Sequence, residues 1–291
     1  MDAVNPSTQP TFASRTPLHI GVVALAVRDL DRIQAYYSDL LGLAVIDRTA
    51  DGVRLGAGGV AFIELQHRPD AKPDDQRTAG LYHTAFLMPT RVDLARWLVR
   101  VAQNRVPVTG VSDHLVSEAI YLDDPEGNGV EVYSDRASET WRRNGDLIEI
   151  TTDPLDLDDL VRAAGDGAAY ADAPAGLRVG HVHLRVGDVE QAEQFYRDTL
   201  GLAVTRRRGG ASFMSSGGYH HHIAANVWHS RGAPVRDPDR AGLAWFSFEA
   251  TDRPTLDAAA ARLTAAGLPV TPTGGGIETA DPWGTRIRLT V

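Results

Sequence analysis

Cysteine is absent from the 291 residues of this chain, and its absence narrows the chemistry that the protein can perform. Disulfides, thiolate nucleophiles and cysteine-based metal sites are all excluded. A metal site would have to use histidine and carboxylate ligands, which suit iron, manganese or zinc. Any metal centre is therefore restricted to nitrogen and oxygen donors.

Long apolar runs and an excess of positive charge are also missing. No stretch approaches the roughly 20 apolar residues that a membrane-spanning helix needs. The first fifteen residues lack a basic segment followed by an apolar core, so we expect a disordered tail there and no secretory leader. The formal net charge of −9 argues against nucleic acid and anionic membranes as partners. We therefore expect a soluble, cytoplasmic protein.

An internal repeat indicates two similar halves. The segment from Asp29-Leu30 to Gly42-Leu43-Ala44-Val45 recurs from Asp188-Val189 to Gly201-Leu202-Ala203-Val204, at a constant offset of 159 residues. Each half divides again into two units of one strand, one helix and three strands. We predict an α+β fold of four βαβββ modules in two domains, residues 16–137 and 177–291. Residues 138–176 are predicted to be a linker with a short helix near Leu157–Ala164.

The third module illustrates how its elements are predicted. A strand at Val179–Val186 precedes a helix that Asp188 would cap and Gly201 would end. Three strands should follow, at Ala203–Arg207, Ala211–Ser215 and Tyr219–Trp228. In the fourth module we expect a helix over about Arg253–Ala266.

The segment from His114 to Glu131 is the most informative part of the chain. Asp124-Pro125-Glu126-Gly127-Asn128-Gly129 is typical of a tight turn, because proline fixes φ and glycine and asparagine tolerate left-handed conformations. Strand-forming residues on both sides, Ala119–Leu122 and Val130–Tyr133, predict a hairpin. Glu131 lies within the second strand, and a carboxylate inside a barrel is costly unless it is paired or bound to a metal.

The pattern H-x(5)-I-Y-x(2)-D-P-x-G-x(3)-E in this segment resembles the signature of extradiol ring-cleavage dioxygenases of the vicinal oxygen chelate superfamily. In that family, paired βαβββ modules curl into a cup around a metal ion. The resemblance implies that Glu131 is a metal ligand. It also implies that His114 binds a catecholic substrate and that Tyr121 contacts it as a catalytic residue.

The resemblance further implies that the ligands come from the first strand of each paired module and from the last strand of one. The corresponding positions, in chain order, hold Val22, His83, Glu131, His181, Trp245 and Arg288. Pairing the second module with the third gives two histidines and one carboxylate, His83, His181 and Glu131. We predict that this set binds iron(II), with manganese(II) as the alternative. Two other sets stay open: Glu64 with His83 and Glu131 inside one domain, and His183 in place of His181.

A histidine cluster, His220-His221-His222, lies on the predicted strand Tyr219–Trp228. The family resemblance implies a catalytic histidine in the context H-x-[LV]-A, which His221 matches. A histidine can shuttle a proton because its pKa lies near neutrality. By strand alternation His221 should face inward, and its two neighbours outward. Elsewhere, we interpret the basic run Arg206-Arg207-Arg208 as a solvated strand end.

These features predict an iron(II)-dependent extradiol dioxygenase that cleaves a small aromatic diol with O₂, as in aromatic catabolism. One alternative is another metal-dependent enzyme of the same fold, such as a glyoxalase or epimerase, which would use Ni, Co or Zn and consume no O₂. A second alternative is a non-catalytic, resistance-type protein that sequesters a ligand. Assembly as a homo-oligomer stays open.

Overall fold

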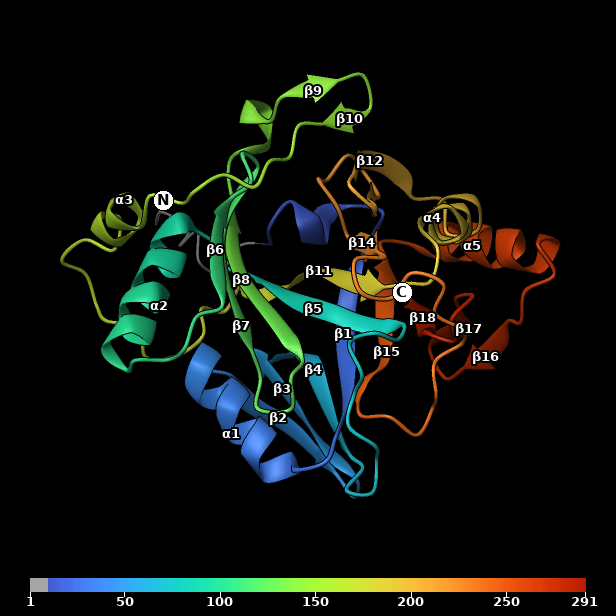
Figure 1. The fold of residues 1–291 in the computed structure, drawn as a ribbon, viewed down its shortest axis with the longest axis horizontal. Coiled ribbons are helices and arrows are strands. Elements are labelled where there is room, and N and C mark those ends of the chain that lie inside the picture. The colour runs from blue at the N-terminus through green and yellow to red at the C-terminus, as the bar shows by residue number, and fades with distance from the viewer. Residues whose placement is uncertain (1–9) are drawn as a thin grey trace.

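The computed structural model describes residues 10–291 and contains four strand–helix–strand units in the predicted order (Figure 1). The first module comprises β1 (Leu18–Val27), α1 (Leu30–Leu41), β2 (Ala44–Thr49), β3 (Gly52–Ala57) and β4 (Val60–His67). The second comprises β5 (Gly80–Leu87), α2 (Arg91–Gln103), β6 (Gly110–Asp113), β7 (Ser117–Asp123) and β8 (Gly129–Asp135).

The second half repeats this order. The third module comprises β11 (Arg178–Arg185), α4 (Val189–Asp198), β12 (Ala203–Arg208), β13 (Ala211–Ser215) and β14 (Ile223–Asn226). The fourth comprises β15 (Gly242–Ala250), α5 (Arg253–Ala265), β16 (Thr271–Thr273), β17 (Gly276–Ala280) and β18 (Arg286–Thr290). Between the halves lie the short strands β9 (Arg143–Asn144) and β10 (Leu147–Ile148) and the helix α3 (Leu157–Arg162).

The helices begin where short polar side chains can cap them. The residues before α1, α2, α4 and α5 each accept a hydrogen bond from the backbone N–H three residues further on; they are Asp29, Thr90, Asp188 and Asp252. Gly42 ends α1 in the left-handed conformation, at φ 70°. In the third module the helix ends earlier than predicted, at Asp198, because Thr199 forms its C-cap before Gly201 is reached.

Each of the two large sheets takes one module from each half. The first sheet has the order β16-β17-β18-β15-β1-β4-β3-β2, and the second has the order β12-β13-β14-β11-β5-β8-β7-β6. The second module thus pairs with the third, through antiparallel β5 and β11 at the centre of the sheet. The predicted α+β fold of βαβββ modules is confirmed. The domain boundaries at 16–137, 138–176 and 177–291 stay a prediction.

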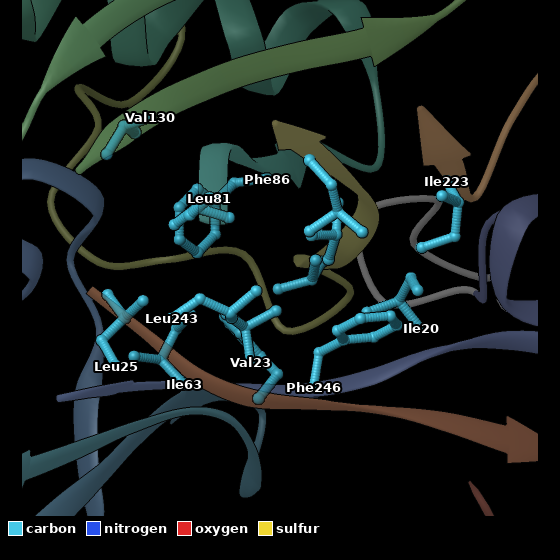
Figure 2. Packing of buried hydrophobic residues seen from close by; sticks show 14 of the residues in the cluster. Ile20, Val23, Leu25, Ile63, Leu81, Phe86, Val130, Ile223, Leu243 and Phe246 are labelled. Atoms are coloured by element: carbon cyan, nitrogen blue, oxygen red, sulfur yellow. The ribbon is translucent and has the colours of Figure 1, made fainter. Parts of the chain in front are cut away.

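The main hydrophobic core lies between the two sheets. Figure 2 shows Val23 and Phe246 of the first sheet among the same buried side chains as Leu81 and Phe86 of the second. Side chains alternate between the faces of a strand, so the neighbouring residues of β5 turn to the other face of the second sheet. On that face Ala85 packs in a separate, smaller core cluster. One face of the second sheet is therefore left to form a site.

The predicted hairpin is present as β7 and β8, which pair antiparallel with Tyr121 opposite Glu131. In the turn between them, Asp124 Oδ1 accepts hydrogen bonds from the backbone N–H groups of Glu126 and Asn128. Tyr37 of α1 donates its hydroxyl hydrogen to Asp124 Oδ2 at 3.3 Å, which ties the first module to the turn of the second. The turn that precedes Glu131 is therefore stabilised both by hydrogen bonds within the turn and by a hydrogen bond from α1.

Two expectations about irregular segments need correction. Part of the predicted disordered tail is ordered: Ala13–Arg15 form a 3-10 helix, and Ala13 is buried; residues 1–9 lie outside the described part. The predicted strand Tyr219–Trp228 shrinks to β14. Hydroxyl groups of Thr205 and Ser215 donate to the carbonyls of His220 and Tyr219, which replaces the regular ladder before Ile223. Within residues 10–291, no helix is long and apolar enough to cross a membrane.

Candidate active site

Both candidate ligand histidines directly follow a bulge in the central strand pair. His83 pairs with His183 and Leu81 with Leu184, so Tyr82 is an extra residue in β5. In the same way Gly180 is an extra residue in β11, before His181. A Cβ at Gly180 would lie 1.9 Å from Tyr133 Oη, so only glycine fits there. Bulges re-aim side chains, and here they occur at both histidines.

His83, Glu131 and His181 converge on one buried point. Glu131 Oε2 lies 2.9 Å from His83 Nε2 and 3.2 Å from His181 Nε2, and the two nitrogens are 3.4 Å apart. One ligand atom from each residue lies within 4.8 Å of the others. Two strands of one half and one strand of the other supply these side chains, as the pairing of the second and third modules requires.

The electrostatics of this cluster suit a divalent cation. Burial alone would raise the pKa of Glu131, but the adjacent His181 and His83 hold it well below its usual range. Burial lowers the pKa of His181 to about 4, so this imidazole is neutral near pH 7 and offers a lone pair. Two histidines and one carboxylate form the donor set of 2-His-1-carboxylate metal centres. The residues present therefore fit an iron(II) or manganese(II) ion.

The competing ligand sets are separated from this cluster or otherwise engaged. Glu64 lies on β4 in the first sheet, where its carboxylate accepts a hydrogen bond from Arg54 at 3.1 Å. His183 lies beside His83, but its Nε2 is hydrogen-bonded to the amide of Asn226 at 2.9 Å. In the first sheet, the guanidinium of Arg288 stacks 3.8 Å from the ring of Trp245. Two of the corresponding positions in that sheet, Trp245 and Arg288, are thus occupied by a cation–π pair.

His114 and Tyr121 form a hydrogen-bonded pair on the same cavity. His114 Nδ1 lies 2.5 Å from the carbonyl oxygen of Thr151, which can only accept, so this nitrogen carries the hydrogen. Its Nε2 then accepts the hydroxyl hydrogen of Tyr121, at 2.6 Å. Burial and the charge of Glu131 raise the pKa of Tyr121 well above its usual value. The phenol therefore stays protonated.

His221 lines the cavity beside the cluster, with its ring centroid 4.1 Å from that of His181. Its two neighbours, His220 and His222, are also buried. His222 is hydrogen-bonded to Thr16 Oγ1 at 3.2 Å. His220 bridges Asp135 and His221, with its Nε2 2.9 Å from Asp135 Oδ1 and its Nδ1 2.7 Å from His221 Nδ1.

The positions of the hydrogens in the series of hydrogen bonds from Asp135 through His220 to His221 follow from the carboxylate at its end. The carboxylate of Asp135 can only accept, so Nε2 of His220 carries a hydrogen. His220 Nδ1 then accepts from Nδ1 of His221, which leaves Nε2 of His221 with a lone pair. Burial, together with neighbouring histidines, lowers the pKa of His221 well below its usual value. Asp135 and His220 thus fix both the orientation and the tautomer of His221.

A single cavity of about 700 Å³ is lined by the three candidate metal donors and by His114, Tyr121 and His221. Aromatic rings form part of its wall: Tyr82 and Trp228 meet edge to face at 5.3 Å, and Phe213 packs against His221 at 5.1 Å. Ile150, Thr151 and Thr152 from the segment between the halves close one side. Sequence reasoning missed these wall residues, although the position of Tyr82 next to His83 was a usable signal.

The chain matches the family model described as Glyoxalase/Bleomycin resistance protein/Dioxygenase superfamily over residues 19–132 and 178–289. It is 36% identical over 270 residues to Catechol-2,3-dioxygenase from Bacillus subtilis (strain 168), which covers 91% of this chain and 94% of that protein.

Solved structures agree on the fold. Glyoxalase I from Zea mays superposes with a TM-score of 0.56 at 16% identity, over 96% of this chain and 94% of that chain. A protein from Bacillus subtilis subsp. subtilis str. 168 gives a TM-score of 0.64 at 16% identity, over 93% and 84%. At such identities the likeness concerns the fold alone. The two family-model matches cover most of both halves, and the chain belongs to the Glyoxalase/Bleomycin resistance protein/Dioxygenase superfamily, the vicinal oxygen chelate superfamily.

Proposed function

We propose that this protein is an iron(II)-dependent extradiol dioxygenase that cleaves the ring of a vicinal aromatic diol with O₂. One observation carries the proposal: three convergent metal donors, a free imidazole nitrogen and a histidine–tyrosine pair share one cavity. The 36% identity to a protein named Catechol-2,3-dioxygenase supports it. The complete donor set argues against a resistance-type protein, because we expect such a protein to lack a full set.

In this proposal His83, His181 and Glu131 hold the metal. When bound, iron(II) supplies adjacent open positions for both diol oxygens and for O₂, together with redox activation. The chain's own contribution is to hold three donors in fixed positions on strands. The aromatic wall of Tyr82, Phe213 and Trp228 receives the apolar faces of the substrate ring.

Tyr121 and His114 orient the diol. The hydroxyl hydrogen of Tyr121 is committed to His114, so its oxygen can accept the O–H of a diol placed at the metal donors. His114 is itself fixed by the carbonyl of Thr151. Holding the reacting groups in one geometry lowers the entropic part of the barrier.

His221 moves the proton. With its lone pair on Nε2, it can accept a hydrogen from the diol and return it later to an oxygen of the opening ring. A positioned acid–base group of this kind contributes about 10²- to 10⁴-fold to the rate. Because burial keeps His221 neutral, the residue enters the reaction as a base.

The assay that tests the proposal uses protein purified without oxygen and loaded with Fe(II). On addition of O₂, a catechol should be consumed with one O₂ per diol, and a yellow ring-opened product should accumulate. If no diol from a panel of substituted catechols causes O₂ uptake at full iron loading, the proposal is wrong. Activity with Ni(II), Co(II) or Zn(II) and without O₂ uptake would instead select a glyoxalase- or epimerase-type enzyme.

The hydrogen bonds that link Asp135 through His220 to His221 give a second test of the role proposed for His221. Asp135→Asn should lower kcat at least about tenfold, because an amide can donate to His220 and reverse its tautomer. Iron content and KM should change little, since Asp135 touches neither the metal donors nor the cavity.

Tyr219→Phe is the matched control. Tyr219 Oη also donates to Asp135 Oδ1, at 3.3 Å, but lies outside the histidine chain. This variant should keep kcat within about twofold of the unmodified protein. A similar loss of kcat in both variants would mean that Asp135 has only a structural role.

A further inference from the structure

The basic run on β12 divides between the two faces of the sheet. Arg207 faces α4, where its guanidinium donates to both carboxylate oxygens of Glu193. Arg206 and Arg208 alternate with it and line the cavity. Arg208 is exposed, as the interpretation of this run as a solvated strand end predicts, whereas Arg206 is only half-exposed. Their side chains belong to the wall of the candidate active site.

Of the three arginines in this run, Arg206 is the one whose side chain has no hydrogen-bond or ion-pair partner among residues 10–291. Arg208 donates to Thr152 Oγ1 at 2.9 Å and is otherwise exposed. The side chain of Arg206, in contrast, forms no hydrogen bond and no ion pair with another residue of the range 10–291, and its Nε is buried. A guanidinium stays charged at all physiological pH values and has five N–H donors. The buried Nε–H of Arg206 has no acceptor, and an unpaired buried donor costs free energy, so this position has room for an anionic partner.

The position of Arg206 relative to the metal donors suggests what that partner is. Arg206 faces Phe213 across the β12–β13 pair. The ring of Phe213 packs edge to face on His221, at 5.1 Å, and His221 packs on His181. A substrate ring held at the metal donors and against Phe213 would therefore direct a substituent toward Arg206. The cavity of about 700 Å³ is within the range of sites that hold ligands larger than one ring.

We propose that Arg206 binds a carboxylate substituent of the substrate, so the substrate class is a vicinal aromatic diol with an acidic side chain. The diol part of this inference rests on the proposed function. A guanidinium binds a carboxylate through two parallel hydrogen bonds, and such charge-assisted bonds are stronger than neutral ones. The site then distinguishes an acid from its uncharged analogues.

Binding without turnover tests the inference. Quenching of tryptophan fluorescence, to which Trp228 in the cavity wall contributes, is followed without O₂ as carboxylated catechols are titrated into the metal-loaded protein. The probes are 3,4-dihydroxybenzoate, 3,4-dihydroxyphenylacetate and 3-(3,4-dihydroxyphenyl)propionate, each with its methyl ester as the uncharged control. At least one acid should bind about 10- to 100-fold more tightly than its ester.

Variants identify the residue responsible. Arg206→Met should remove the preference for the acid and leave the affinity for the ester within about twofold, whereas Arg206→Lys should keep part of it. Arg207→Met, on the outer face of the same strand, should keep the full preference. Equal affinities for acid and ester in the unmodified protein would overturn the inference, and so would equal weakening of both in Arg206→Met.

This test is independent of catalysis. If acid binding depends on Arg206 but no O₂ is consumed, the carboxylate site stands and the dioxygenase proposal fails. If O₂ is consumed with neutral and acidic diols at the same kcat/KM, the dioxygenase proposal stands and the carboxylate site is wrong.

Discussion

Replacing Glu131 with glutamine is expected to abolish tight metal binding and ring cleavage while the fold persists. Glu131 supplies the only negative charge among the three donors, and an amide oxygen is a much weaker ligand for a divalent ion. Loss of residues that only support a ligand already costs about 10- to 100-fold in metal affinity. Loss of the ligand itself should therefore cost at least about 100-fold. Metal content after dialysis and titration with Fe(II) would measure the change.

The first sheet offers a matched control. Glu64 lies next to Ala24 of β1 in the same parallel register that places Glu131 next to Ala85 of β5. Glu64→Gln should therefore leave metal affinity and ring cleavage unchanged. If Glu131→Gln retained its iron, or if Glu64→Gln lost it, the metal site would have been assigned to the wrong residues.

The second large effect is expected for His221→Phe. This variant keeps a flat ring in the cavity but removes the nitrogen that accepts the proton, so kcat should fall about 10²- to 10⁴-fold. Metal affinity should stay the same, because His221 is not among the three donors. Stopped-flow mixing of the diol complex with O₂ would measure the rate directly.

Binding of the diol separates a chemical role of His221 from a structural one. The affinity for the diol without O₂ should change little in His221→Phe, since the remaining contacts come from Tyr121 and the aromatic wall. His229→Phe, which alters an exposed histidine, serves as the control and should react normally. A loss of diol affinity that matches the loss of kcat would contradict the role assigned to His221.

Much of this architecture could be predicted because the sequence contains an internal repeat. The repeat indicated the modules, and the motif around the turn before Glu131 pointed to one candidate ligand from residues close in the sequence. At the positions that the family resemblance implies, pairing the second module with the third gave two histidines and one carboxylate, although a set with Glu64 and one with His183 stayed open. Periodic patterns and short motifs carry such information because the residues involved are close in the sequence.

Contacts between distant segments could not be predicted in this way. The bond from Thr151 to His114 and the bond from Asp135 to His220 join residues that no pattern connects. The predicted strand at Tyr219 began too early, because hydroxyl groups from neighbouring strands interrupt the ladder before β14. The unpaired state of Arg206 is also a property of its surroundings. Such features depend on where acceptors lie in space.

Two of the three donors belong to one repeat, and His181 belongs to the other. A bound ion would therefore cross-link the two halves where β5 pairs with β11. Neither half of the chain alone could offer more than two of its ligands. By mass action, an ion present at 1,000 times its dissociation constant adds about 4 kcal/mol to the free energy of unfolding. The stability of the β5–β11 interface between the two repeats would therefore depend on the supply of the metal.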